Sequence, residues 1–169
     1  MPVRHEYALD LAGEAGPGPR SRPADLVLRA ITPGDQRALA ELMLDAYRDT
    51  IDYEGEEIEE ALAEVDRYFG GAGGNMPLLE HSFALVRGQR LDSACLVKQW
   101  GARGCPLVGY VVTAKACKSH GLDGFVLAQS IRALRLAGHS EIRAVITDGN
   151  HASETLFRHA GFARVRETA

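Results

Sequence analysis

The chain has 169 residues, of which 46% are hydrophobic and 25% are charged, a composition typical of one globular domain with a full core. The net charge of −4 argues against nucleic acid as a general partner and is more compatible with a cationic small molecule. No apolar run approaches the length needed to span a bilayer, and the N-terminus lacks the apolar core of a signal peptide. We therefore expect no membrane partner and a cytoplasmic protein.

The cysteines Cys95, Cys105 and Cys117 are odd in number, and their spacings match no common metal-binding pattern. Reduced thiols are typical of cytoplasmic proteins. The cysteine pattern therefore predicts neither a disulfide framework nor a metal site.

Residues 1–23 form an N-terminal extension ahead of a domain predicted at 24–169. Tyr7, Leu9 and Leu11 alternate with Ala8 and Asp10, which is typical of a short strand. Residues 13–23 are rich in Gly and Pro, as in a flexible or extended linker. The extension is either a disordered tail or an arm that pairs with a sheet edge or with a second subunit. Pairing with a second subunit would make a homodimer.

Two amphipathic helices are predicted after a first strand at 26–31. Thr32, Pro33 and Asp35 form a helix start, because a Thr cap, an early Pro and an acidic residue are each favoured there. The first helix then has one apolar stripe at helical spacing: Leu39, Leu42, Met43, Ala46 and Tyr47. The second helix has a stripe with the same period: Ile58, Leu62, Val65 and Phe69.

The segment between these helices, residues 48–57, is acidic. Its last glutamates have a structural explanation, since negative charge is favoured at the start of a helix. Asp52, Tyr53 and Glu54 precede the helix and lack that explanation. They form either a solvated acidic loop or a loop that recognises an amine, because loops often carry function.

Three sequential strands, at 82–86, 91–99 and 107–113, are expected to be antiparallel. A helix that ends at Gly138 leads to a strand at 144–146, and this strand–helix–strand unit should be parallel and right-handed. A helix capped by Asn150 and a last strand at 162–165 follow. The order predicts an α/β fold with a mixed central sheet and helices on both faces.

The crossing from the strand at 107–113 to the next helix contains Lys118, His120, Gly121 and Gly124. Such a turn leaves N–H groups unpaired at the positive end of the helix dipole, where an anion such as a pyrophosphate can bind. Gly121 lets the backbone approach the anion closely. His120 either donates to a phosphate oxygen or is an exposed loop residue. A plain strand-to-helix turn is the bland interpretation of the whole segment.

Together, the order of elements and these motifs resemble the GCN5-related N-acetyltransferase family over residues 24–166. The family's phosphate turn has the form Q/R-x-x-G-x-G/A, and Lys118, Gly121 and Asp123 occupy its three positions. A second family signature is matched by Asn150, by Leu156 with Phe157, and by Gly161 with Phe162. Residues 46–56 resemble the acceptor-side loop of bacterial members.

The resemblance implies acetyl-CoA as co-substrate, with its pyrophosphate on the N–H groups of residues 119–124. It implies that the pantetheine arm lies along the strand ending at 111–113, which splays away from the strand at 142–147. The implied cofactor-binding residues are Val111, Val112, Thr113, Lys118, Ser119, His120, Gly121, Leu122, Asp123, Gly124, Asn150 and Phe157. The implied acceptor is a primary amine of a small molecule or a protein, bound by Asp52, Tyr53 and Glu54.

Acetyl transfer to an amine needs a base, because an amine with a pKa near 10.4 is mostly charged at neutral pH. Glu54 is the candidate base, directly or through water, and Glu80 and His81 are the two rival candidates. A backbone N–H near Val112 is the candidate oxyanion donor. Lys98 and Trp100 are candidates for the acceptor side, although packing is the favoured role for the tryptophan.

Three residues depart from the family pattern. Asp123 stands where the family has Gly or Ala, and a pyrophosphate repels its carboxylate by about 1 kcal/mol or more at close range. Lys118 keeps the charge of the family's arginine but not its fork. Phe157 stands where many members have a tyrosine near the thiolate, and it has no proton to give. The alternative to an enzyme is therefore a non-catalytic module that binds CoA or another ligand on the same fold.

Overall fold

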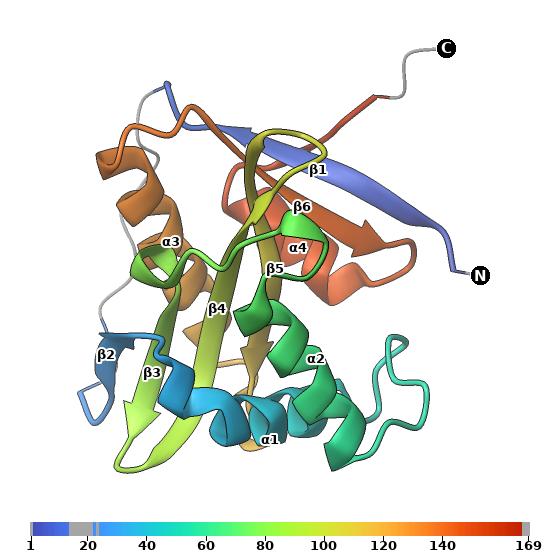
Figure 1. The fold of residues 1–169 in the computed structure, drawn as a ribbon, viewed down its shortest axis with the longest axis vertical. Helices are drawn as coiled ribbons and strands as arrows, with labels where there is room; N and C mark the ends of the chain where they lie inside the picture. Colours follow the sequence, from blue (N-terminus) through green and yellow to red (C-terminus); the bar gives the residue numbers. More distant parts are fainter. Residues whose placement is uncertain (1, 14–21, 23, 167–169) are drawn as a thin grey trace.

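The computed structural model describes residues 2–13, 22 and 24–166. The strands are β1 (Arg4–Asp10), β2 (Val27–Ala30), β3 (Phe83–Arg87), β4 (Arg90–Trp100), β5 (Cys105–Thr113), β6 (Glu141–Thr147) and β7 (Ala163–Arg164). The α-helices are α1 (Gln36–Tyr47), α2 (Ile58–Gly70), α3 (Leu122–Leu136) and α4 (His151–His159). The strands form one seven-stranded sheet in the order β2–β3–β4–β5–β6–β1–β7 (Figure 1). No helix in the described ranges is long and apolar enough to cross a membrane.

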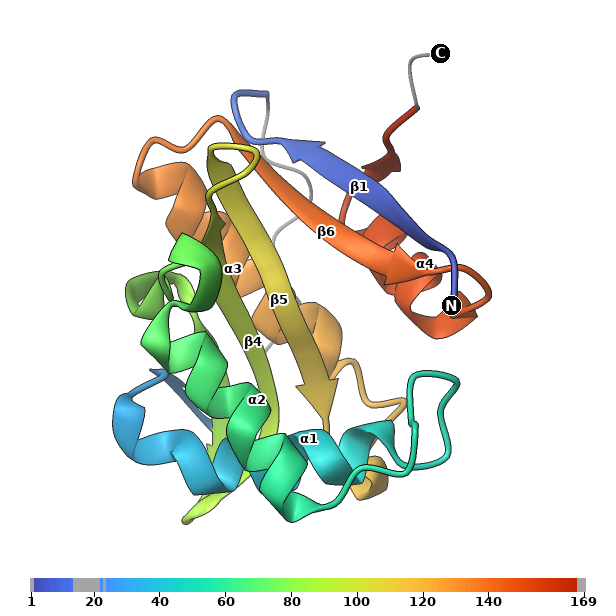
Figure 2. The ribbon, with the colours of Figure 1, turned by 45° about the vertical axis from the view of Figure 1, so that its right-hand side comes forward.

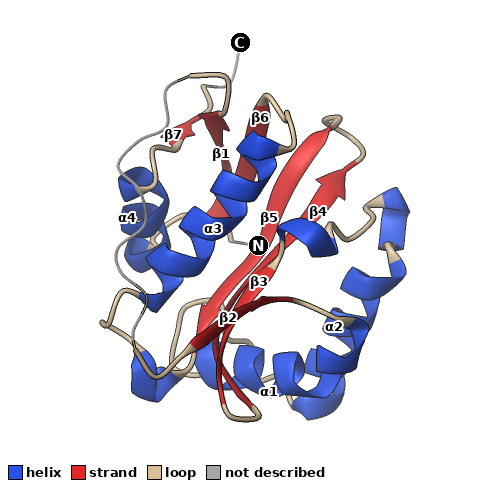
Figure 3. Cartoon of the chain, turned by 90° about the vertical axis from the view of Figure 1, so that its left-hand side faces the viewer, coloured by secondary structure: helices blue, strands red, loops and turns tan. Residues whose placement is uncertain are grey.

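Helices cover both faces of this mixed sheet, as the sequence predicts. Helices α3 and α4 contribute Leu127, Ile131 and Phe157 to one core cluster, which also contains Val97 of β4. Helices α1 and α2 contribute to a second cluster, which contains Leu96 of β4. Because neighbouring strand residues point to opposite faces, Leu96 and Val97 place the two clusters on opposite sides of the sheet. Figure 3 shows α1 and α2 on one side and α3 and α4 on the other.

The sheet opens at its centre, between β5 and β6. Strands β2 to β5 are joined by antiparallel pairing throughout, which confirms the expected run of antiparallel strands. Strands β5 and β6 are parallel, but they pair only at Leu107–Arg143 and Val108–Ala144. Beyond these two pairs the strands diverge toward their C-terminal ends (Figure 2). The predicted splay is therefore present, and it leaves backbone groups of β5 without a partner strand on that side.

The N-terminal extension contributes a strand to the interior of this sheet. Strand β1 pairs with β6 along its whole length and with β7 on its other side. Tyr7 is 2% exposed and Leu11 is 3% exposed, so this segment is part of the core. Of the linker expected at 13–23, residues 14–21 and 23 lie outside the described residues. Strand β1 thus pairs within its own chain, and its first residues reach the open end of the β5–β6 gap.

A buried ion pair holds the start of α1. The Asp35 carboxylate accepts hydrogen bonds from the Arg29 guanidinium at 2.8 and 2.7 Å and from the Thr32 backbone N–H at 2.9 Å. The hydrogen bond from Arg29 is the main cause that lowers the pKa of Asp35 below its ordinary value. The predicted helix start is thus confirmed, and it takes the form of a 3₁₀ turn, Pro33–Asp35, that leads into α1.

Asp35→Asn is expected to lower the free energy of unfolding by about 1–3 kcal/mol at pH 7, because a buried charged hydrogen bond is lost. A carboxyl group whose pKa is lowered on folding stabilises the fold above its unfolded pKa, and this contribution is lost as the pH falls through the folded pKa. As the pH falls below 3.8, the ordinary pKa of an aspartate, the variant should therefore lose less stability than the parent. Urea unfolding across pH measures both effects. Asp25→Asn, an exposed position, is the control; an equal change in both variants would contradict the assignment.

Candidate active site

Two adjoining cavities lie at the open end of the β5–β6 gap. The large cavity has a volume of about 610 Å³ and lies between α1, α2 and the 48–57 loop on one side and β5, β6 and β1 on the other. The small cavity, of about 350 Å³, extends from β5 to the turn before α3. Both cavities are lined by Tyr47, Asp52, Val111, Asn150, Ser153 and Leu156. These six residues therefore mark the junction through which the two cavities meet.

In β5, the backbone N–H and C=O groups of alternate residues face the gap. The Ala114 N–H donates to the Asp92 carbonyl on β4 at 2.8 Å, which fixes the phase of the antiparallel ladder. Two residues earlier, Val112 is again in a hydrogen-bonded pair, so its N–H and C=O face β4. The polar groups of Val111 and Thr113 therefore face the gap. The N–H of Val111, which lies at the junction, therefore faces the gap where the oxyanion donor is expected, and the N–H of Val112 does not.

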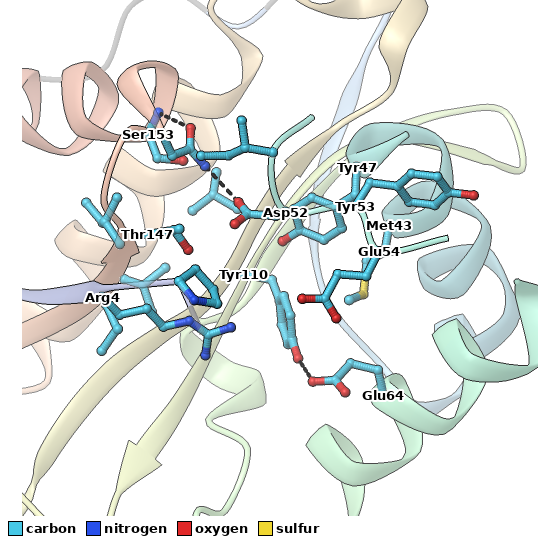
Figure 4. Close-up of a pocket in the computed structure, with 18 of the residues that line it drawn as sticks. Arg4, Met43, Tyr47, Asp52, Tyr53, Glu54, Glu64, Tyr110, Thr147 and Ser153 are labelled. Atoms are coloured by element: carbon cyan, nitrogen blue, oxygen red, sulfur yellow. Dashed lines mark hydrogen bonds between the residues drawn. The ribbon is translucent and has the colours of Figure 1, made fainter. Parts of the chain in front are cut away.

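A β-bulge at Gly109 interrupts the pairing of β5 with β4 two residues before Val111. Leu96 pairs with Tyr110 and Val97 with Val108, so Gly109 has no opposite residue on β4. An added Cβ at Gly109 would lie 3.4 Å from the Leu96 carbonyl oxygen, which leaves little room for a side chain. Bulges bend a strand and are common next to active sites. Here the bulge precedes Tyr110, whose ring lines the large cavity (Figure 4).

The turn before α3 begins the helix with a glycine, and neighbouring polar groups are already hydrogen-bonded there. Gly121 caps α3 at a φ of 76°, in the left-handed region that favours glycine. The Gly124 N–H donates to its neighbour, the Asp123 carboxylate, at 2.8 Å. The Lys118 ammonium donates to the Ala46 carbonyl at the end of α1, at 2.8 Å. An incoming anion would therefore compete with Asp123 for a backbone donor.

Most of the residues predicted to bind the cofactor line the small cavity. They are Val111, Val112, Thr113, Lys118, Ser119, Leu122, Asp123 and Asn150. His120, Gly121 and Gly124 belong to the same turn but do not line that cavity. Phe157 lines the large cavity instead, where its buried ring packs edge-on against Phe162 at 5.0 Å between centroids.

Asp123→Gly is expected to tighten acetyl-CoA binding about fivefold or more, because it removes a charge repulsion of about 1 kcal/mol and frees the Gly124 N–H. Asp123→Asn separates the two causes, since it removes the charge and keeps a side chain that can accept the same hydrogen bond. Isothermal titration with acetyl-CoA measures both dissociation constants. Unchanged affinity in both variants would show that the pyrophosphate does not bind at this turn.

A hydrogen bond crosses the junction between the two cavities. The Asn150 side-chain amide donates to the Asp52 carboxylate at 2.8 Å, and its oxygen accepts from the Ser153 N–H at 3.2 Å. The first contact ties the 48–57 loop to the start of α4 (Figure 4). The cap role predicted for Asn150 is therefore confirmed, and the same side chain also positions Asp52.

The three predicted acceptor residues, Asp52, Tyr53 and Glu54, all line the large cavity. The Glu54 side chain points into the cavity, opposite Arg4 (Figure 4). The Tyr53 hydroxyl donates to the Glu56 carbonyl at 3.3 Å, a contact within the loop. The loop therefore places two carboxylates at the cavity: Asp52 is held by Asn150, and Glu54 is directed inward.

A further carboxylate of the large cavity, that of Glu64, is not predicted from the sequence. Glu64 of α2 accepts hydrogen bonds from the Tyr110 hydroxyl and from Arg67. Burial alone would raise the pKa of Glu64, but these hydrogen bonds outweigh it and lower the pKa below its ordinary value. Burial, and then the Glu64 carboxylate, raises the pKa of Tyr110. Glu64 occupies a position on the polar face of a helix, so its spacing offers no signal that a strand brings Tyr110 against it.

The remaining candidates for the base and for the acceptor side divide between cavity and surface. Lys98 lines the large cavity. Trp100 does not, and the Arg103 guanidinium lies over its ring at 5.5 Å. Glu80 and His81 lie in the 3₁₀ turn Leu79–His81 and line neither cavity, and the His81 ring packs edge-on against His139. Glu54 is therefore the candidate base that the structure places at the cavity.

Comparisons with known proteins rest on structure alone. No family model and no curated protein sequence matches this chain. A GCN5-related N-acetyltransferase from Sphaerobacter thermophilus is similar in structure, with 19% sequence identity and a TM-score of 0.73. The superposition covers 98% of this chain and 50% of the Sphaerobacter chain. A tandem GNAT protein from the clavulanic acid biosynthesis pathway matches 100% and 55%, with 17% identity and a TM-score of 0.67.

AAC(6′)-Iy in complex with the bisubstrate analogue CoA-S-monomethyl-acetylneamine matches 85% of this chain and 95% of its own, with 11% identity and a TM-score of 0.60. This chain thus spans about half the length of the first two of these proteins. The splayed strands and the turn before α3 that the resemblance implies are present, and the structural likeness extends over most of the chain. The chain has the fold of the GCN5-related N-acetyltransferases.

Proposed function

We propose that this chain is an N-acetyltransferase that moves an acetyl group from acetyl-CoA to a primary amine of a small molecule or a protein. One observation carries the proposal: Val111 lines both cavities, and its backbone N–H faces the gap between β5 and β6. Two substrates that enter from opposite cavities would meet at this donor. The three unpaired cysteines fit a reducing compartment, so the cytoplasm is part of the proposal.

The residues of the small cavity fit a CoA thioester along most of its length. The gap-facing backbone groups of Val111 and Thr113 can hydrogen-bond the amides of a pantetheine arm as a neighbouring strand would. The N-terminus of α3 can hold the pyrophosphate once the Asp123 carboxylate has left the Gly124 N–H. When bound, the thioester supplies the activated acetyl group.

The large cavity fits the amine. Its carboxylates attract a cationic acceptor, and Glu54 is the one that is directed inward with no side-chain hydrogen bond in the described residues. Glu64 is held by Tyr110 and Arg67, and Asp52 by Asn150. Glu54 therefore takes the proton from the amine, directly or through a water molecule. The Val111 N–H donates to the carbonyl oxygen as negative charge develops on it.

Departure of the thiolate has no tyrosine to assist it. The Phe157 ring is packed against Phe162 and offers no proton. Ser153 lies one helical turn before Phe157 and lines both cavities. We assign the hydrogen bond to the leaving sulfur to this hydroxyl. A thiol with a pKa near 8.5 needs only modest help at neutral pH, so a weak donor is sufficient.

A second candidate function is a non-catalytic module that binds CoA. The Asp123–Gly124 contact favours it, since that contact occupies part of the phosphate turn. The packed Phe157 favours it as well, because a tyrosine is missing there.

Two measurements separate these functions. Acetyl-CoA at saturation should raise the melting temperature in both cases, and thiol release with a panel of amines should occur for the enzyme alone. Stabilisation without thiol release across the panel would favour the module. No stabilisation would contradict both.

A further inference from the structure

The large cavity carries opposite charges on opposite walls. Five carboxylates line it: Asp52, Glu54, Glu56, Glu60 and Glu64. Three cations also line it: Arg4, Arg67 and Lys98. Arg67 pairs with Glu64, and Lys98 acts electrostatically on the same carboxylate. Arg67 is therefore already paired and Lys98 lies within the field of Glu64, whereas Arg4 extends into the cavity from the facing wall.

Strand β1 fixes the place of Arg4. Arg4 pairs with Thr147 at the C-terminal end of β6, beyond the point where β5 and β6 separate. Figure 4 shows its guanidinium directed into the cavity, near Tyr110 and facing Glu54. Arg4 does not line the small cavity, so it lies away from the turn expected to bind the phosphates.

Arg4 also differs in its partners from the arginines of β2 to β6 and of their turns. Arg29, Arg87, Arg90, Arg103 and Arg143 each pair with a carboxylate of the sheet or its turns. Within residues 2–13, 22 and 24–166, the Arg4 guanidinium has neither an ion pair nor a hydrogen bond. A guanidinium directed into a cavity with its donors free is suited to a ligand, because its fork matches a carboxylate with two parallel hydrogen bonds.

We propose that the acceptor is a zwitterion, a primary amine that also bears a carboxylate, as in an amino acid. This inference rests on the proposed acetyl transfer and specifies its substrate class. The Arg4 guanidinium holds the carboxylate, and the ammonium group faces Glu54 and the Val111 junction. A single negative charge is tolerated among the cavity's carboxylates because Arg4 neutralises it, whereas a doubly charged phosphate would be repelled.

The test compares the twenty amino acids with their primary amides, which keep the size and lose the negative charge. For the best acceptor, Arg4→Gln should raise the KM for the acid about 10- to 100-fold and leave the KM for the amide unchanged. Arg4→Lys should give a smaller rise, since it keeps the charge without the fork. Arg132→Gln, an exposed position on α3, is the control and should change neither. The acid-to-amide ratio is compared between variants, so the different amine pKa values of acid and amide cancel.

The outcomes separate this inference from the proposed function. Amides acetylated as well as acids, with a ratio that Arg4→Gln does not change, would overturn the zwitterion and leave the acetyltransferase standing. If no amine is acetylated, the proposed acetyltransferase function is wrong. Titration of the amino acids into the protein saturated with CoA then tests whether Arg4 binds a carboxylate. Binding that needs both the carboxylate and Arg4 would support the inference. Equal binding by the parent protein and Arg4→Gln, or no binding by either, would overturn it.

Discussion

Glu54→Gln is expected to lower kcat/KM for the amine acceptor about 10²- to 10⁴-fold at pH 7, the range for loss of a general base. An amine with a pKa near 10.4 is mostly protonated at that pH and cannot attack a thioester. Glu54 points into the large cavity, whereas Glu64 is engaged by Tyr110 and Arg67. The substitution keeps the size of the side chain and removes its capacity to take a proton.

The pH profile distinguishes a base from a group that only attracts the cation. As the pH rises, more of the amine is already neutral, so the deficit of Glu54→Gln should shrink toward pH 10. Loss of attraction alone would raise KM and leave kcat unchanged. Glu59→Gln is the matched control, because Glu59 is exposed in the first turn of α2 and lines neither cavity. A deficit that is the same at every pH would exclude Glu54 as the base.

Val111→Pro should lower kcat about 10²- to 10³-fold, the loss found when one oxyanion donor is removed. Proline removes the N–H of Val111, which faces the gap and has no partner strand there. The fold should tolerate this change, since β6 pairs with β5 only as far as Val108. Stopped-flow measurement of thiol release gives kcat, and thermal melting shows that the variant is folded.

Val112→Pro is the matched control one residue along the strand. The N–H of Val112 faces Ala94 in the β4–β5 ladder, so its loss should cost about 2–3 kcal/mol of the free energy of unfolding. The pair therefore predicts opposite outcomes, with activity lost at 111 and stability lost at 112. The reverse pattern would show that the N–H of Val112 faces the gap and that the N–H of Val111 faces β4.

Much of the fold follows from local patterns in the sequence. The two apolar stripes predict α1 and α2, and the glycine-rich turn at 118–124 predicts the start of α3. The splay between β5 and β6 is expected from the resemblance to a family. No pattern specifies the place of β1, because a short alternating segment before a linker can pair with any free edge. The structure places it between β6 and β7.

Only part of the candidate site can be predicted from the sequence, because residues from distant parts of the chain meet only in the folded structure. Asp52, Tyr53 and Glu54 are contiguous, and their acidity precedes a helix, so the loop can be singled out. Arg4 and Glu64 reach the same cavity from distant parts of the chain, and each looks like an ordinary surface charge. Only the pairing of β1 with β6 and the packing of α2 beside β5 bring them together.

A crystal structure with CoA tests the central claim most directly. The account predicts the pantetheine arm between β5 and β6, hydrogen-bonded to the backbone of Val111 and Thr113, with the sulfur at the junction near Asn150. It also predicts that the Asp123 carboxylate has left the Gly124 N–H and that the pyrophosphate has taken its place. A CoA molecule bound elsewhere, with the gap empty and the Asp123–Gly124 hydrogen bond intact, would contradict it.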